Sequence, residues 1–274
     1  MAFRPIYRTP SQHLLWMPVD RVTGTSLYVG QLVKCDNVNL NGAAPLAVAS
    51  GAGDASSDQT IFGVVVGTSD HTATFDATYG QYQASAAATQ AANLARRNLG
   101  VSGMHPKGDP CGMVQIARIF ADTVLEGNIY LTTIGTAPTL LTATTASTDG
   151  LGFTTNTCGM TMTSTGNLST TYCRTGANAG MYRVNSDTSA TVAVFATPWP
   201  YDVAIGDTFV RVPFRQGTCW ANINDDAGYI GMFLDAALNE ATNYYKIDVH
   251  ALDLRTAGKE RAIFTFNGAH FAAK

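Results

Sequence analysis

Residues 176–212 read GANAGMYRVNSDTSATVAVFATPWPYDVAIGDTFVRV and contain three short runs in which side-chain character alternates. The runs cover residues 180–184, 189–195 and 208–212. Alternation is typical of β-strands, because successive side chains point to opposite faces. Residues 185–188 between the first two runs are Asn, Ser, Asp and Thr, which favour a tight turn. The stretch therefore predicts an antiparallel meander of three strands.

A proline corner separates the second and third runs of this stretch. Pro198 and Pro200 cannot donate to a sheet ladder, and Trp199 and Tyr201 stand beside them. The two aromatic residues are candidates for contact with a partner, although packing at a strand corner explains them more simply. No catalytic constellation occurs in the stretch.

The chain is unusually poor in charge for its length. It has 274 residues, of which 14% are charged, against about 25% in an ordinary soluble domain. Only three residues are glutamates: Glu126, Glu240 and Glu260. A sparsely charged β-rich surface indicates either that other protein chains cover much of it or that Ser, Thr and Asn keep it soluble.

The charge balance and the hydropathy pattern argue against several classes of partner. The net charge is −3, so we expect no nucleic acid and no anionic membrane as partner. No apolar run approaches the roughly 20 residues that span a bilayer. The first twenty residues lack the charged-then-apolar order of a signal peptide, which predicts synthesis and residence in a cytoplasm.

The five cysteines show no metal-binding or scaffold spacing, and no C-x-x-C pair occurs. We therefore expect no zinc site and no disulfide framework, but free buried thiols. A pairing of Cys158 with Cys173 across two strands stays open at this point. The cysteines are Cys35, Cys111, Cys158, Cys173 and Cys219.

The order of the segments predicts an all-β chain made of small β-barrel or sandwich domains. We expect an extended N-terminal arm over residues 1–25, a barrel-like domain over 26–147 and a second β-rich domain over 148–274. We place the domain boundary in residues 142–149, a run made mostly of Thr, Ala and Ser. The arm packs either on its own domain or on a neighbouring subunit. Its apolar anchors, and so its candidate contact residues, are Phe3, Ile6, Tyr7 and Trp16.

One accessory helix is expected in the first domain, over residues 81–98. This segment is rich in Ala, Gln, Leu and Arg, contains no Gly or Pro, and is followed by Gly100. Its apolar residues are nearly all alanine, so we expect it to dock on a sheet or a neighbour.

The chain offers no pattern for an enzyme, a metal or a cofactor. The five histidines are isolated, and no nucleophile elbow or phosphate-binding loop occurs. Residues 222–226 resemble a calcium loop only superficially, because Phe233 stands where a bidentate glutamate belongs. We expect no catalytic residue, no metal and no cofactor.

Two sequence patterns in the chain resemble those of tailed-bacteriophage virion proteins. One pattern is the predicted hairpin, which resembles a sequence pattern of virion proteins and reads GANAGMYRV…SATVAVFATPWPYDVAIGDTFVRV. The other is similar to the small barrels of capsid decoration (cement) proteins and reads GQLVK…APLAVASG…IFGVVVG. The resemblance implies a non-enzymatic virion protein that clamps neighbouring major capsid subunits on the capsid surface, often as a homotrimer. Such a protein is assembled in the host cytoplasm. The predicted helix and the segment after Gly217 have no counterpart in this resemblance.

Two other functions remain as alternatives. A tail or fibre component that binds a host glycan or receptor would show an exposed aromatic cluster, for which Trp199, Tyr201 and Trp220 are the candidates. A polysaccharide-active enzyme would need converging carboxylates. For these the least implausible set is Asp225, Asp226 and Glu240.

Overall fold

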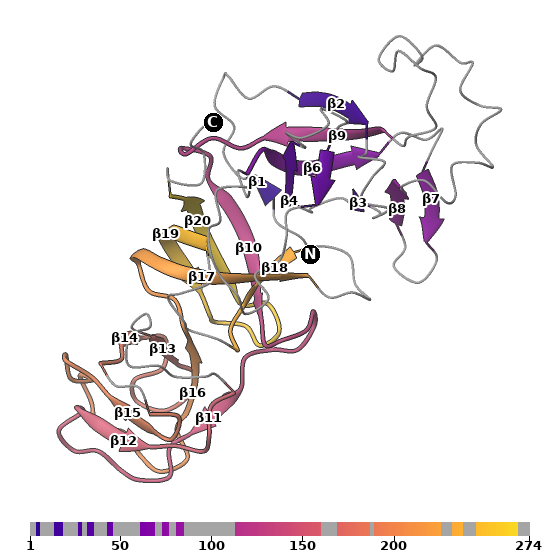
Figure 1. Cartoon of the computed structure of the whole chain (residues 1–274). Coiled ribbons are helices and arrows are strands. Elements are labelled where there is room, and N and C mark those ends of the chain that lie inside the picture. Colours follow the sequence, from indigo (N-terminus) through magenta and orange to yellow (C-terminus); the bar gives the residue numbers. More distant parts are fainter. Residues whose placement is uncertain are drawn as a thin grey trace, which may run out of the picture.

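The fold is known from a computed structural model that describes thirteen segments of the chain. They are residues 4–5, 14–18, 27–28, 32–35, 43–45, 61–68, 73–76, 81–84, 113–159, 169–186, 189–225, 232–237 and 245–267. Every regular element in these segments is a β-strand, which confirms the all-β prediction (Figure 1).

The first half of the chain forms two sheets. A five-stranded sheet has the order β2-β9-β6-β4-β5, and a three-stranded sheet has the order β3-β8-β7. The strands are β2 (Leu14–Pro18), β9 (Met113–Arg118), β6 (Gly63–Thr68), β4 (Leu32–Cys35), β5 (Ala43–Pro45), β3 (Leu27–Tyr28), β8 (Gln81–Ala84) and β7 (Ala73–Asp76).

A six-stranded sheet, here called the central sheet, follows in the order β1-β10-β18-β17-β19-β20. Its strands are β1 (Arg4–Pro5), β10 (Leu125–Tyr130), β18 (Met232–Asp235), β17 (Gly217–Asp225), β19 (Tyr245–Asp253) and β20 (Arg261–Phe266). Because β10 pairs with β20 as well as with β18, the pairing of the last five strands is cyclic.

Residues 140–212, here called the distal unit, are inserted between β10 and β17 and lie at the far end of the molecule (Figure 1). Four strands pair in the order β11-β16-β13-β14, and β12 pairs with β15. Isolated bridges join the two sheets at Ala143–Thr155 and Asn185–Phe195. The strands are β11 (Leu140–Thr142), β16 (Thr208–Val212), β13 (Thr170–Cys173), β14 (Tyr182–Val184), β12 (Gly152–Thr154) and β15 (Val192–Val194).

Two apolar cores result from this arrangement. One core runs from the five-stranded sheet through the central sheet to Tyr172 and Val210 on one face of the distal sheet. The other lies inside the distal unit, where Cys173 and Phe209 on the opposite face meet Phe153. All four residues of β13 are buried, because both faces of this strand pack against apolar side chains.

The predicted meander is correct in its strands and wrong in their pairing. Strands form at 182–184, 192–194 and 208–212, but none of the three named strands pairs with another. Strand β14 pairs with β13, β15 with β12, and β16 lies between β11 and β13. Only the Asn185–Phe195 bridge joins the ends of the first two strands. Turn residues alone did not fix the pairing, because the buried strand β13 was the stronger partner.

The predicted helix over residues 81–98 is wrong in its first four residues. Residues 81–84 form β8, which pairs with both β7 and β3. Backbone pairing with two strands therefore outweighs the local helix preference of this short segment. Residues 85–98 lie outside the described residues, and the barrel form of the predicted domains is not confirmed.

Described parts of the predicted N-terminal arm are extended and pair within the chain. Strand β1 pairs with β10 at Leu125 and Glu126, and β2 pairs with β9 along its whole length. Pairing also crosses the expected boundary at 147, since β10 pairs with β18 and β20 while β11 pairs with β16.

Candidate functional site

The six residues expected to contact a partner have different positions in the structure. Phe3, Ile6 and Tyr7 lie outside the described residues, and Trp16 is a residue of the edge strand β2. Trp199 is only 3% exposed, whereas Tyr201 is 57% exposed. Of the predicted contact residues whose side chains are described, Tyr201 is therefore the one presented to solvent.

Trp199 is a core residue of the distal unit. Its ring lies 5.4 Å from that of Phe195 and 5.7 Å from that of Phe209. The guanidinium of Arg183 lies over it, 5.5 Å from the ring centre. The chain passes so close to Gly150 that a Cβ there would stand 2.7 Å from the Trp199 carbonyl oxygen. Trp199 is therefore a packing residue at the proline corner, as the simpler of the two interpretations predicts.

The loop that carries Tyr201 is held by buried polar side chains. The Asn178 amide accepts from the Tyr201 N–H at 3.1 Å and donates to the Tyr201 carbonyl at 2.8 Å. Asp207, also buried, accepts from the Ala204 N–H at 2.9 Å. Ile205, between these anchors, is 69% exposed. The loop thus presents Tyr201 and Ile205 on a fixed backbone, and we call residues 200–206 the distal loop.

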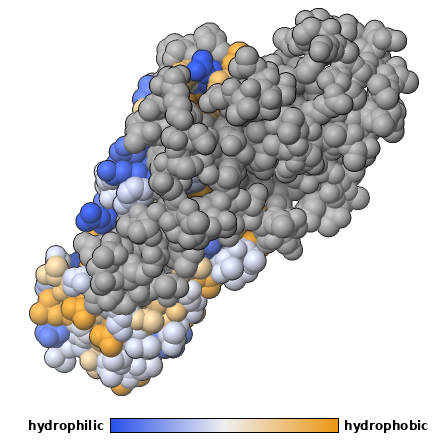
Figure 2. Space-filling model, in the orientation of Figure 1, coloured by the Kyte–Doolittle hydropathy of each residue, from blue (hydrophilic) through white to orange (hydrophobic). Residues whose placement is uncertain are grey.

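Exposed large apolar side chains concentrate on the distal unit. Among the described residues, Leu14 alone of this group lies elsewhere. Figure 2 shows hydrophobic atoms gathered on the visible face of the distal unit. Apolar surface of this kind marks contact sites more often than single scattered residues do. The exposed residues are Leu140, Leu151, Val184, Val192, Val194, Tyr201 and Ile205.

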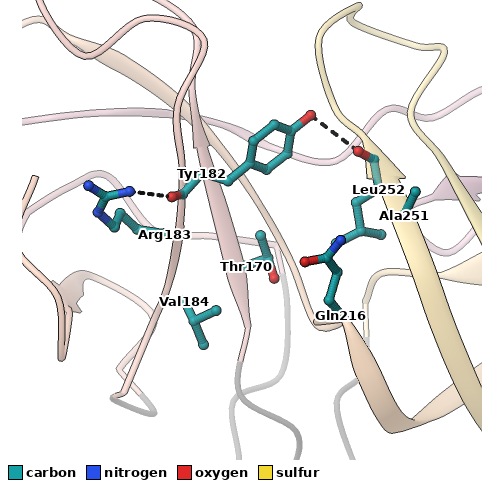
Figure 3. A pocket seen from close by; sticks show the side chains of 7 residues that line it. All are labelled: Thr170, Tyr182, Arg183, Val184, Gln216, Ala251 and Leu252. Atoms are coloured by element: carbon teal, nitrogen blue, oxygen red, sulfur yellow. Dashed lines mark hydrogen bonds between the residues drawn. The ribbon is translucent and has the colours of Figure 1, made fainter.

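A crevice of about 320 Å³ lies where the distal unit meets the central sheet (Figure 3). Thr170, Tyr182 and Val184 line one side, and Gln216, Ala251 and Leu252 the other, with Arg183 beside them. The described lining contains no carboxylate, imidazole or thiol. The lining groups of a kind that general acid-base or nucleophilic chemistry uses are the hydroxyls of Thr170 and Tyr182.

The junction beside this crevice is held by polar contacts. The Tyr182 hydroxyl donates to the Leu252 carbonyl at 3.3 Å and accepts from the Leu254 N–H at 3.2 Å. Burial raises the pKa of this hydroxyl. The side chain of Tyr182 thus fixes the strand β14 to the end of β19.

A buried ion pair strengthens the same junction. Arg174, which follows β13, donates to the Glu260 carboxylate at 2.5 Å and to the Leu254 carbonyl at 2.9 Å. The side chain of Glu260 is 1% exposed and that of Arg174 12%. Sequence reasoning missed both residues. The one signal that pointed to them was the scarcity of glutamate in the chain.

A charged network covers the β19–β20 hairpin of the central sheet. Arg255 holds the Asp253 carboxylate through two hydrogen bonds of 2.8 and 3.0 Å. Arg261 joins Asp253 at 3.2 Å to Glu126 at 2.8 Å. The hydrogen bonds from Arg255 hold the pKa of Asp253 well below its usual range. This network stabilises the hairpin, and its acids are paired with bases.

Three cysteines whose side chains the structure describes are free and buried, which confirms the prediction for these three. Cys158 and Cys173 do not pair, and Cys219 is also free. Burial raises the pKa of Cys173 to about 12 and that of Cys219 to about 11. These two thiols stay protonated at neutral pH and are poor nucleophiles.

The carboxylates considered for a polysaccharide-active enzyme lie mostly outside the described residues. Asp225 ends β17, whereas Asp226 and Glu240 lie outside the described residues. Residues 222–225, part of the stretch that superficially resembles a calcium loop, belong to β17. In the segments that the structure describes, no group of three His, Cys, Asp or Glu side chains could hold a metal ion.

The candidate glycan-binding aromatics are also separate. Trp199 is in the core of the distal unit, while Trp220 is a partly buried residue of β17 in the central sheet. Tyr201 stands apart from both on the distal loop. The three residues thus form no common platform for a sugar ring.

Comparison with known proteins gives no relative of this chain. No family model, no curated protein and no solved structure matches it significantly. None of the described residues forms a helix long and apolar enough to cross a membrane.

Proposed function

We propose that this chain is a non-enzymatic structural protein of a virus particle, which binds major capsid subunits as a cement protein. Its place would be the capsid surface, after assembly in the host cytoplasm. The resemblance to virion proteins in residues 176–212 supports the proposal, and these residues form much of the distal unit.

The observation that carries the proposal is the apolar surface of the distal unit. Tyr201 and Ile205 are more than half exposed, on a unit that contains no lysine and no glutamate between residues 140 and 212. Covering such side chains removes apolar surface from water, although Asp202, exposed between them, has to stay hydrated or find a partner. A protein that functions in contact with other protein chains can bury this apolar surface in its interfaces.

Rigidity of the distal loop supports the same role. Asn178 and Asp207 fix the loop backbone from inside, so binding would order few additional residues. A preorganised contact loses less conformational entropy on association than a mobile one. Many such modest contacts, repeated over a shell, add up through avidity.

The finer form of the fold belongs to this proposal. We expect the central sheet and the distal unit to be small barrels or sandwiches, as in the cement proteins that the sequence resembles. The cyclic pairing through β10 and β20 supports a barrel for the central sheet.

The N-terminal residues Phe3, Ile6, Tyr7 and Trp16 stay predicted as a second contact element. Deleting residues 1–19 is a poor test, because it would remove β1 and β2 and expose the edge of β9. A triple substitution of Phe3, Ile6 and Tyr7 to Ser leaves both strands intact. We expect it to weaken shell binding while preserving the thermal unfolding midpoint.

The function is tested by adding the purified chain to shells of its own virus that lack it. We expect the chain to sediment with the shells at a fixed ratio to major capsid protein. A chain that stays in the supernatant at every concentration would refute the proposal. A host-glycan array and a reducing-sugar assay run in parallel identify the fibre or enzyme alternatives, and a signal in either would also count against it.

A further inference from the structure

One face of the distal sheet is turned toward the crevice at the junction with the central sheet. The register places Thr170 of β13 opposite Val184 of β14, and Tyr172 opposite Tyr182. Directly opposite residues share a face of the sheet. Tyr172 packs in the core that the distal unit shares with the central sheet, so Thr170, two residues away on the same strand, points the same way. The side chain of Thr170 is therefore part of the crevice wall (Figure 3).

The hydroxyl of Thr170 is buried without a hydrogen-bond partner in the part of the chain that the structure describes. The residue is 5% exposed, and its Oγ1 atom makes no hydrogen bond. A hydroxyl in this position has lost its bonds to water and gained none in return, which disfavours folding. Most buried polar side-chain atoms of native proteins have a partner. An unpartnered hydroxyl in a crevice wall is one that a ligand can satisfy.

A second free polar atom stands on the opposite wall of the crevice. The side-chain nitrogen of Gln216 donates to the His250 carbonyl at 3.1 Å, which orients the amide. Figure 3 shows the amide oxygen on the side that faces Thr170. Among the described residues, no group donates to this oxygen. The crevice thus offers a hydroxyl donor on one wall and a carbonyl acceptor on the other.

The charged residue of the described lining, Arg183, is already engaged elsewhere. Its guanidinium donates to the Pro198 carbonyl at 2.9 Å and to the Tyr182 carbonyl at 2.8 Å, and it lies over the Trp199 ring. Because the described lining also contains no carboxylate, the crevice favours an uncharged ligand. The apolar side chains of the lining are Val184, Ala251 and Leu252.

The number of free polar atoms decides which uncharged ligand the crevice fits. One residue of an extended peptide presents one N–H and one C=O to the same side, as it does in an antiparallel ladder. One hydroxyl donor and one carbonyl acceptor satisfy both groups. A sugar ring carries several hydroxyl groups, most of which would lack a partner here, since the Tyr182 hydroxyl is already bonded at both its donor and acceptor sides. The volume of about 320 Å³ suits a small ligand, because ligand pockets hold about 300 to 1,000 Å³.

We propose that the crevice binds an uncharged peptide segment of another protein chain. The Thr170 hydroxyl donates to the carbonyl of one extended residue, and the Gln216 amide oxygen accepts from the N–H of the same residue. An apolar side chain of the segment packs against Val184 and Leu252. This site goes beyond the proposed function, because it adds a contact apart from the distal loop and names the chemistry that the contact recognises. The source of the segment in a capsid subunit rests on the proposed function, whereas its peptide chemistry does not.

An NMR titration of the ¹⁵N-labelled full chain with the blocked tripeptide acetyl-Ala-Val-Ala-amide tests this site. We expect saturable shifts of the backbone amides of Thr170, Gln216 and Ala251, with a dissociation constant of about 1 mM, since one bound residue makes a weak contact.

Two variants remove the proposed hydrogen bonds one at a time. Thr170→Val keeps the shape of the side chain and removes a hydroxyl that has no partner in the described chain, so the thermal unfolding midpoint should stay the same or rise. Gln216→Met removes the acceptor. Each should weaken peptide binding about fivefold, the change expected from one neutral hydrogen bond. Thr208→Val is the matched control, because it makes the same change at a hydroxyl that is bonded to Thr175, and it should bind the peptide like the wild type.

Three results would overturn the inference. The first is the lack of saturable shifts at these amides with about 20 mM peptide. The second is peptide binding by Thr170→Val that is as tight as that of the wild type. The third is tighter binding of N-acetylglucosamine, which carries an N–H and a C=O on a sugar, and this result would also count against the proposed function. Sedimentation with shells is measured separately, so the first two results leave the proposed function standing.

Discussion

The distal unit and the central sheet are both built from β-strands, yet they present different surfaces to water. On the central sheet, Asp253, Arg255, Arg261 and Glu126 form a continuous charged network. The distal unit has no lysine or glutamate and exposes valine, leucine, isoleucine and tyrosine instead. The charged surface suits permanent contact with solvent, and the apolar surface suits contact with protein.

The difference shows that the two cores support two different kinds of surface. The central core ties the five-stranded sheet to the C-terminal strands, and the distal core supports the exposed apolar loops. Arg174 and Tyr182 fasten the two parts to each other at the β19–β20 hairpin. The distal unit is thus a supported contact element.

The largest expected effect concerns the independence of the two cores. Phe209→Ala in the distal core and Phe264→Ala in the central core each remove a fully buried ring. Each should lower the free energy of unfolding by about 3 to 5 kcal/mol. Because the residues share no aromatic partner, the losses should add within about 0.5 kcal/mol in the double variant, as measured by urea unfolding. Strong non-additivity would show that the cores act as one.

The second effect concerns the ion pair at the junction. Glu260→Leu leaves Arg174 largely buried without its carboxylate, which should lower the free energy of unfolding by about 3 kcal/mol. The double variant Arg174→Met with Glu260→Leu removes both charges and should recover most of this loss. Equal stability of the single variant and the wild type in urea unfolding would contradict a role for this pair in fastening the distal unit.

A smaller effect concerns the charged surface and depends on pH. The pKa of Asp253 is lowered in the folded chain, so its ionised form adds stability above the unfolded pKa of about 3.9. This stability disappears as the pH falls toward the folded pKa. Asp253→Asn should therefore cost about 1 kcal/mol or less at pH 7, and the difference from the wild type should shrink below pH 4. A difference that is constant with pH would rule out this linkage.

The smallest effect on stability is expected at the distal loop. Tyr201→Ser and Ile205→Ser change exposed side chains, so the free energy of unfolding should stay within about 0.5 kcal/mol of the wild type. A loss above 2 kcal/mol, at the upper end of typical point-mutation effects, would mean that these side chains support the fold instead of a contact.

The sequence predicted where the strands of the distal unit lie better than it predicted which strands pair with one another. Alternation identified residues 182–184, 192–194 and 208–212, since each of these strands has faces of different exposure or packing. It missed β13, because a strand buried on both faces shows no alternation. Without β13 the pairing of β14 and β16 was out of reach. The helix prediction was wrong at residues 81–84 for another reason, because strand pairing with β7 outweighed the local helix propensity.

The candidate contact residues were predictable only in part. The proline corner drew attention to Trp199 and Tyr201, but nothing in the local pattern separated the buried ring from the exposed one. Asn178 belongs to the hairpin that resembles virion proteins, but its hydrogen bonds to the Tyr201 and Asp202 carbonyls join segments more than twenty residues apart and could not be predicted from that pattern. Ile205 carried no motif.

The central claim, that the distal loop binds the shell and the charged β19–β20 hairpin does not, is tested most directly by shell occupancy of two matched double variants. One carries Tyr201→Ser and Ile205→Ser on the distal loop, and the other carries Arg255→Ser and Lys259→Ser on the exposed hairpin of the central sheet. We predict that the distal variant loses at least nine-tenths of its occupancy, while the hairpin variant binds like the wild type. Full occupancy of the distal variant would contradict the claim.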